Sequence, residues 1–226
     1  MPSKKGVIII IPAYNEAGNI GAVLERLEQE MPTTAIVVVD DGSTDKTADI
    51  VKKHGCKVIS LPVNLGIGGA VQTGFKYAYE RGYDIAVQMD GDGQHDASEI
   101  AKLIVPVINQ EADVVKGSRY LGEPDYNAPL MRRTGMILFA NIASLMLGQR
   151  ITDTTSGFWA VNRRALELLV NNYPTDYPDA DNLIYLGLSG LKITEIPVKM
   201  HSRLSGSSTI NTVGSVYYPF KIIIIG

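Results

Sequence analysis

The sequence predicts an α/β protein with a mostly parallel central sheet and helices on both faces of that sheet. In the first half of the chain, short runs of β-branched residues alternate with longer segments whose apolar residues recur at helical spacing. The runs are apolar throughout, which is typical of parallel strands that are buried on both faces. Polar clusters follow these runs, at the carboxyl ends of strands where ligands bind in such sheets.

Four strands and four helices are expected before residue 110. Each strand is a run of four or five residues rich in valine and isoleucine, and a helical segment follows each one. The last of these helices has Asp96 or Ser98 as its expected cap. The strands are expected at 7–11, 35–39, 57–60 and 85–89, and the helices at 20–27, 44–54, 68–81 and 98–108.

The second half is less regular. Its apolar stretch at 136–148 would cover roughly 20 Å as a helix, which is short of the ~30 Å hydrocarbon core of a bilayer. We therefore expect a helix that lies on a membrane or in the core and does not cross the membrane. Strands are expected at 113–116, 158–162 and 194–198, and helices at 130–147, 164–171 and 180–188.

Composition limits the classes of function. Lysine and arginine number 21 against 24 aspartate and glutamate residues, a net charge of −3, so no overall basic field would recruit nucleic acid. The single cysteine, Cys56, has no partner for an internal disulfide, which fits a reducing compartment. The first apolar run is too short for a signal peptide.

Asp90 and Asp92 lie two residues apart at a strand end, so their side chains leave the same face of the chain. Two carboxylates this close repel each other unless a cation lies between them. Such a site suits Mg²⁺ or Mn²⁺ completed by substrate phosphates, with Gln94 offering an oxygen and His95 a nitrogen. The alternative is an Asp-Gly turn whose carboxylates cap the next helix.

Asp40 and Asp41 end the second expected strand and allow the same two interpretations. As binding residues they would accept hydrogen bonds from a nucleobase N–H or from ribose hydroxyls. The glycine-rich segment 64–74 fails the dinucleotide-binding Gly-x-Gly-x-x-Gly pattern, because Val71 occupies the last glycine position. Its glycines would still let the backbone approach a ligand near a helix start.

Six short blocks together resemble glycosyltransferase family 2, and more narrowly its dolichol-phosphate mannose synthase-like branch. The resemblance implies the GT-A fold of nucleotide-diphospho-sugar transferases, in a single domain over residues 1–210 followed by an apolar tail at 211–226. The blocks run in the family's order and are 11–16 (IPAYNE), 39–45 (VDDGSTD), 64–70 (NLGIGGA), 89–95 (MDGDGQH), 117–120 (GSRY) and 153–158 (DTTSGF).

The resemblance implies a donor site in which Mg²⁺ or Mn²⁺ holds the diphosphate. Asp92 is also implied to be catalytic, because an ion held there stabilises the charge of the leaving group. The implied metal ligands are Asp90, Asp92 and Gln94. The implied nucleotide-sugar-binding residues are Pro12, Tyr14, Glu16, Asp40, Asp41, Gly69, Asp90 and Gly91.

The acceptor decides whether a general base is needed. A sugar hydroxyl needs one, whereas a lipid monophosphate is already an anion and needs only cations to hold it. Arginines ahead of an amphipathic helix suit a lipid phosphate, and the alternative is a core helix with solvated arginines. The family resemblance favours the lipid phosphate. The expected acceptor-phosphate ligands are Arg119, which is also expected to be catalytic, and Arg132, Arg133, Arg203 and Ser205.

We therefore expect inverting, metal-dependent transfer of a hexose from a UDP- or GDP-sugar to a polyprenyl or dolichyl phosphate. The enzyme would be peripheral on the cytoplasmic membrane face, and the apolar C-terminal end suggests a small integral membrane partner. One alternative is transfer to a glycan hydroxyl, with Asp179 or Asp181 as the catalytic base; another is a non-catalytic nucleotide-binding subunit. Trp159 departs from the family, which often has arginine there.

Overall fold

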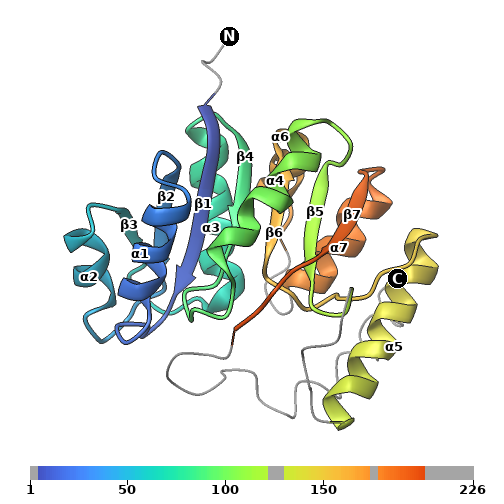
Figure 1. The fold of residues 1–226 in the computed structure, drawn as a ribbon, viewed down its shortest axis with the longest axis horizontal. Coiled ribbons are helices and arrows are strands. Elements are labelled where there is room, and N and C mark those ends of the chain that lie inside the picture. Colours follow the sequence, from blue (N-terminus) through green and yellow to red (C-terminus); the bar gives the residue numbers. More distant parts are fainter. Residues whose placement is uncertain (1–4, 122–129, 174–177, 202–226) are drawn as a thin grey trace.

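The computed structural model describes residues 5–121, 130–173 and 178–201, and a seven-stranded sheet runs through its centre (Figure 1). The strand order is β3-β2-β1-β4-β6-β5-β7; every neighbouring pair is parallel except those that include β6. This confirms the predicted mostly parallel sheet. The strands are β1 Lys5–Ala13, β2 Ala35–Asp40, β3 Lys57–Ser60, β4 Tyr83–Gln88, β5 Val114–Ser118, β6 Trp159–Asn162 and β7 Ile193–Pro197.

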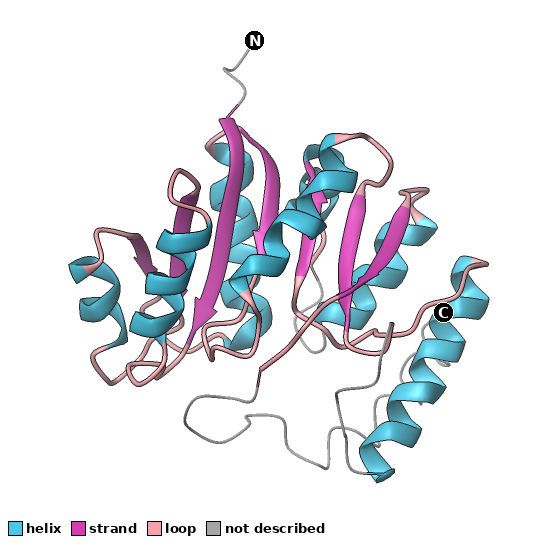
Figure 2. Ribbon diagram, in the orientation of Figure 1, coloured by secondary structure: helices cyan, strands magenta, loops and turns pink. Residues whose placement is uncertain are grey.

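Helices cover both faces of the sheet, as predicted (Figure 2). On one face lie α1 (Ile20–Glu30), α2 (Thr47–Lys53) and α4 (Ile100–Ile108). On the other lie α3 (Gly66–Glu80), α6 (Arg163–Asn171) and α7 (Pro178–Leu188). The remaining α-helix of the described chain, α5 (Leu130–Leu147), packs against α7. None of the helices in the described ranges is long and apolar enough to span a membrane.

Strand β1 shows why its sequence is apolar without interruption. Ile9 and Ile11 pack into the core on the α1 face, while Ile8 and Ile10 pack into the core on the α3 face. All four side chains are at most 1% exposed, so each strand position requires an apolar residue.

Helix starts depend on local caps. The expected helix at 44–54 begins only at Thr47, because the Asp45 carboxylate accepts a hydrogen bond from the Thr47 backbone N–H and holds the preceding residues as a loop. Asp96 accepts a hydrogen bond from the Ser98 N–H at the start of the short 3₁₀ helix η1 (Ala97–Glu99), which confirms one of the two expected caps.

The carboxyl ends of the parallel strands meet at the lower edge of the sheet in Figure 1, and β6, being antiparallel, begins there. The segment after β7 returns across this edge towards the sheet centre. There the His201 N–H donates to the Gln94 carbonyl at 2.7 Å, and Met200 forms a β-bridge with His95. The carboxyl edge therefore collects residues from distant parts of the chain.

Candidate active site at the carboxyl edge of the sheet

The polar clusters after β1 and β2 are locked together. The Asp41 N–H donates to the Ala13 carbonyl at 2.9 Å. Asn15 donates its backbone N–H to the Ser43 hydroxyl, and its side-chain oxygen accepts the Thr44 N–H at 2.8 Å. Asn15 has φ 54°, a left-handed conformation that asparagine adopts more readily than most residues. These bonds bring two predicted parts of the nucleotide site side by side.

Asp40 and Asp41 are both buried and both make local hydrogen bonds. One oxygen of Asp40 accepts the Ser43 N–H at 3.1 Å, and one of Asp41 accepts the Leu65 N–H at 2.7 Å. Burial raises the pKa of the Asp41 carboxyl. The capping interpretation thus holds for one oxygen of each carboxylate, and their contact with a nucleotide stays a prediction.

Four other predicted donor-site residues differ in their environments. Pro12 is buried in β1, whereas Tyr14 is 41% exposed and Glu16 is half-buried. Gly69 packs so closely that a Cβ there would lie 2.6 Å from the Leu65 Cβ. The structure supports a packing role for Gly69, and its backbone approach to a ligand stays a prediction.

His95 anchors the acidic loop, which corrects its expected role as a nitrogen ligand. Its Nδ1 accepts the Asp90 N–H at 3.0 Å, and its ring stacks on Phe158 at a centroid distance of 4.7 Å. Burial lowers the pKa of His95 to about 4, so the ring is neutral at neutral pH. Because the Nδ1 lone pair is used inside the protein, that nitrogen is not offered to an ion.

The remaining donors of the acidic loop fit a divalent ion. The Asp90 side chain is 37% exposed, and a Cβ on Gly157 would lie 2.9 Å from its Oδ1, so a glycine is needed for the carboxylate to lie there. Asp92 accepts the Gln94 N–H with Oδ1 at 3.0 Å. Within 5–121, 130–173 and 178–201 no cluster of three or more His, Cys, Asp or Glu side chains forms a closed metal cage. Two carboxylates and an amide oxygen suit Mg²⁺ or Mn²⁺, which retain water or phosphate ligands.

A buried ion pair lies at the carboxyl edge of the sheet, which we also call the rim. Arg119, just after β5, donates from Nε and Nη2 to the two oxygens of Asp153, at 2.7 Å each, and also bonds Thr155. Burial alone would raise the pKa of Asp153, but the hydrogen bonds and charge of Arg119 lower it below its usual value. Part of the predicted phosphate-binding guanidinium is therefore committed to Asp153, and its contact with a phosphate stays a prediction.

A row of four side chains that carry polar groups crosses the sheet near its carboxyl edge, and this row was not predicted. Gln88, Trp159, Lys116 and Glu195 are register partners across β4, β6, β5 and β7. The indole N–H of Trp159 donates to Gln88 Oε1 at 2.7 Å, and the Lys116 Nζ lies 5.2 Å from the Trp159 ring centroid. Burial lowers the pKa of Lys116, and the charges of Asp179, Asp153 and Glu195 oppose that shift. A lysine within an apolar strand was the available sequence signal.

The two acids proposed as a base lie at the start of α7 and differ in environment. Burial raises the pKa of the Asp179 carboxyl to about 6, and the charge of Lys116 opposes that rise. Asp181 is half-buried. For Arg132 and Arg133 the structure gives only the backbone of α5, and Arg203 and Ser205 lie outside the described residues, as does the tail at 211–226.

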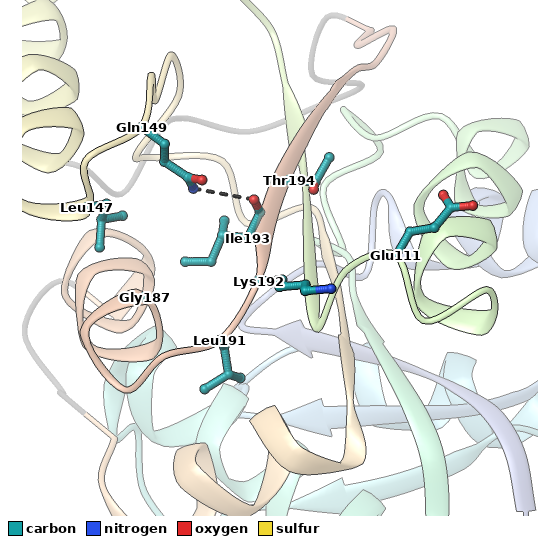
Figure 3. Close-up of a pocket in the computed structure, with 8 residues that line it drawn as sticks. All are labelled: Glu111, Leu147, Gln149, Gly187, Leu191, Lys192, Ile193 and Thr194. Carbon is teal, nitrogen blue, oxygen red and sulfur yellow. Dashed lines mark hydrogen bonds between the residues drawn. The ribbon is translucent and has the colours of Figure 1, made fainter.

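Two hollows lie away from the carboxyl edge. A hollow of about 420 Å³ is lined by Gln149, Leu191 and Ile193 among others, at the start of β7 (Figure 3). Its Gln149 amide donates to the Ile193 carbonyl at 3.3 Å. A second hollow of about 360 Å³ lies at the starts of β1, β2 and β3. Neither contains a predicted site residue.

Comparison with known proteins assigns the chain to a class of enzyme. The family model described as "Glycosyl transferase family 2" matches residues 8–169. The chain is 37% identical over 218 residues to UDP-N-acetylglucosamine–dolichyl-phosphate N-acetylglucosaminyltransferase of Methanococcus voltae, covering 86% of this chain and 85% of the relative. It is 33% identical over 216 residues to undecaprenyl-phosphate mannosyltransferase of Micrococcus luteus, covering 91% and 87%.

A solved structure supports the same fold. Glucosyl-3-phosphoglycerate synthase of Mycobacterium tuberculosis, crystallised with Mn²⁺, UDP and glucosyl-3-phosphoglycerate, superposes with a TM-score of 0.69 at 19% identity, covering 90% of this chain and 73% of that one. The chain is thus an enzyme with the GT-A glycosyltransferase fold. It belongs to glycosyltransferase family 2, as the resemblance of its motifs predicted.

Proposed function

We propose that this glycosyltransferase transfers a hexose from a UDP- or GDP-sugar to a polyprenyl or dolichyl phosphate at the cytoplasmic face of a membrane. The observation that carries the proposal is the presence of three polar groups along one edge of the sheet: the buried pair Asp40 and Asp41 after β2, the acidic loop at Asp90 after β4, and Arg119 after β5. The names of the relatives support the lipid phosphate, because several act on dolichyl or undecaprenyl phosphate.

The chemistry is a direct displacement at the anomeric carbon. A phosphate oxygen of the acceptor forms a new bond to the anomeric carbon. The bond from that carbon to the oxygen of the nucleoside diphosphate breaks at the same time, so the configuration at the carbon inverts. Asp90, Asp92 and Gln94 would hold a divalent ion that stabilises the charge of the departing diphosphate. Cationic side chains would hold the acceptor anion near the donor. The acceptor carries its own negative charge, so no base is required.

One observation supports the alternative in which a glycan hydroxyl is the acceptor. Burial raises the pKa of Asp179 to about 6, which suits a general base. The non-catalytic alternative is set aside, because the chain belongs to a family of glycosyltransferases. A small membrane partner is mentioned in neither relative's name above and stays a prediction.

The decisive experiment offers the purified full chain UDP-glucose, UDP-N-acetylglucosamine and GDP-mannose, each with dolichyl or undecaprenyl phosphate and Mg²⁺ or Mn²⁺. We expect a lipid-linked sugar phosphate, identified by mass. Asp92→Ala should lower the rate by at least about 100-fold, the scale seen when a group stabilising transition-state charge is lost. The control is Asp49→Ala, whose exposed carboxylate lies beside Lys52. Full turnover in Asp92→Ala would contradict the assignment.

A further inference from the structure

Buried polar atoms without a partner are concentrated in one place. In the described part of the chain, five buried side-chain nitrogen or oxygen atoms make no hydrogen bond, and they belong to only four residues. Leaving such atoms unpaired costs free energy, so native proteins keep few of them, and a cluster needs an explanation. The atoms are Thr154 Oγ1, Tyr173 OH, Asp179 Oδ1, Asn182 Nδ2 and Asn182 Oδ1.

One of these residues, Thr154, lies next to Lys116, whose side chain is wholly buried on β5. Its Nζ donates to the Thr154 carbonyl, but the bond is long at 3.4 Å. Burial lowers the pKa of Lys116 and the charge of Asp179 opposes that shift, yet no ion pair joins the two among the described residues. Burial raises the pKa of the Tyr173 hydroxyl, the charge of Asp179 raises it further, and the Asn182 side chain opposes the rise. In the described part of the chain, neither the Tyr173 hydroxyl nor the Asn182 amide has a partner with hydrogen-bond geometry. We call Lys116, Thr154, Tyr173, Asp179 and Asn182 the buried polar cluster.

The buried polar cluster adjoins the carboxyl edge of the sheet. Lys116 and Gln88 are both register partners of Trp159. A Cβ on Gly157 would lie 3.0 Å from Gln88 Nε2 and 2.9 Å from Asp90 Oδ1, so Gln88 lies close to the acidic loop. Ser118, two residues after Lys116 on β5, lies on the same sheet face as Lys116. Burial raises the pKa of Tyr173 and of Asp179, and the charge of Asp90 raises both further, so Asp90 lies within electrostatic range of the cluster.

We propose that the buried polar cluster binds hydroxyl groups of the transferred sugar, and that Lys116 and Asn182 determine which sugars the enzyme accepts. The inference rests on the proposed function and deepens it, because it names the part of the protein that recognises the hexose. Lys116 and Asn182 are both wholly buried. The proposal therefore requires the bound hydroxyl to enter the layer of side chains inside the carboxyl edge.

The chemistry of the cluster favours a hydroxyl over the other groups in the reaction. A hydroxyl donates one hydrogen bond and accepts others, so a single one can donate to Asp179 Oδ1 and accept from Lys116 Nζ. Asn182 offers a further donor and a further acceptor. A phosphate has only acceptor oxygens at neutral pH and would be repelled by the Asp179 carboxylate. A lipid chain would leave every one of these polar atoms unpaired.

The test compares free nucleotides with nucleotide sugars by isothermal titration calorimetry on the full chain with Mg²⁺. The probes are UDP, UDP-glucose, UDP-N-acetylglucosamine, GDP and GDP-mannose. We expect Asn182→Leu and Lys116→Met to weaken binding of the nucleotide sugar at least tenfold while binding of its free nucleotide stays within twofold. The matched control for lysine is Lys57→Met, which changes an exposed side chain on β3.

A second measurement separates recognition from a structural role. Asn182→Leu removes two unpaired buried atoms, so the thermal midpoint of the ligand-free variant should rise while affinity for the sugar falls. Equal losses for nucleotide and nucleotide sugar, or no loss in either variant, would overturn the inference and leave the proposed function intact. Failure of the wild-type chain to bind any of the five probes would contradict both.

Discussion

A single ion pair orders the segment that leads into β6. Asp153 is wholly buried, and Arg119 grips both of its oxygens through Nε and Nη2. Glu195 on β7 accepts the N–H groups of Thr152 and Asp153, so the same segment is also held to the edge strand. A bidentate pair with such support is geometrically specific, unlike an exposed pair.

Asp153→Asn should therefore be costly. It leaves the Arg119 guanidinium without a carboxylate in a mostly buried site, and the free energy of unfolding should fall by about 3 kcal/mol. Urea denaturation measures the change. The matched control is Asp49→Asn in the exposed pair with Lys52, where the loss should stay below about 0.5 kcal/mol. A similar small loss in both variants would contradict this interpretation.

Asp179 should make stability depend on pH in the direction opposite to Asp153. Its folded-state pKa is raised from 3.8 to about 6, so the folded protein holds a proton that the unfolded chain has released between these values. The contribution of Asp179 is thus fully present below pH 3.8 and is lost as pH rises through about 6. Because the residue as a whole is partly exposed, we expect a change on the order of 2 kcal/mol.

The measurement is the difference in unfolding free energy between the wild-type chain and Asp179→Asn, taken at intervals between acid and neutral pH. Asparagine does not titrate, so the wild type should lose stability relative to the variant as pH rises. A difference that does not vary with pH would show that Asp179 titrates normally.

The positions of site residues that belong to sequence motifs could be predicted, and the grouping of residues outside these motifs could not. Asp40, Asp41, Asp90 and Asp92 follow apolar runs, so the sequence alone predicts their place at the carboxyl edge. Of the buried polar cluster, Asp179 was predicted as a site residue, but the grouping of the five residues was not, because they come from β5, α7 and the connections between elements. Only the register of β5 with β6 shows that Lys116 lies beside Trp159.

At the scale of elements, α3 lies so close to β1 that a glycine is required between them. A Cβ on Gly74 would lie 2.2 Å from Cγ2 of Ile10 in the sheet. Gly74→Ala should lower the free energy of unfolding by about 2 kcal/mol, because overpacking outweighs the better helix propensity of alanine.

The control for Gly74→Ala is Gly21→Ala in α1, where the nearest atom would be at an ordinary 3.6 Å and no loss is expected. Thermal or urea unfolding of both variants measures the contrast. In a double-mutant cycle, Ile10→Ala should cost less in the Gly74→Ala variant than in the wild-type chain, because it removes the methyl group that clashes. Full stability of Gly74→Ala would mean that α3 shifts away from β1 without cost.

The type of most elements could be predicted from the sequence. Short runs that are apolar throughout predicted strands, and longer segments with apolar residues at helical spacing predicted helices. Their directions could not all be predicted. Strand β6 runs antiparallel to its neighbours, and its four residues carry the same apolar pattern as a parallel strand. Its direction depends on the long connection through α5, whose path no local pattern specifies.

At the scale of the whole molecule, the antiparallel strand helps to build the site. Because β6 begins at the edge where the other strands end, the 153–158 segment reaches the rim beside the acidic loop, and Gly157 meets Asp90 there. The order of the seven strands depends on tertiary packing and could not be read from single segments.

The chain leaves β7 at the border of the sheet, yet residues 200 and 201 are fastened to the acidic loop through Met200 and His201. Two parts fastened in this way cannot respond independently. Thermodynamic linkage is reciprocal. A ligand that stabilises the acidic loop should also stabilise residues 200 and 201, and a change that destabilises these residues should weaken binding of that ligand by the same coupling free energy.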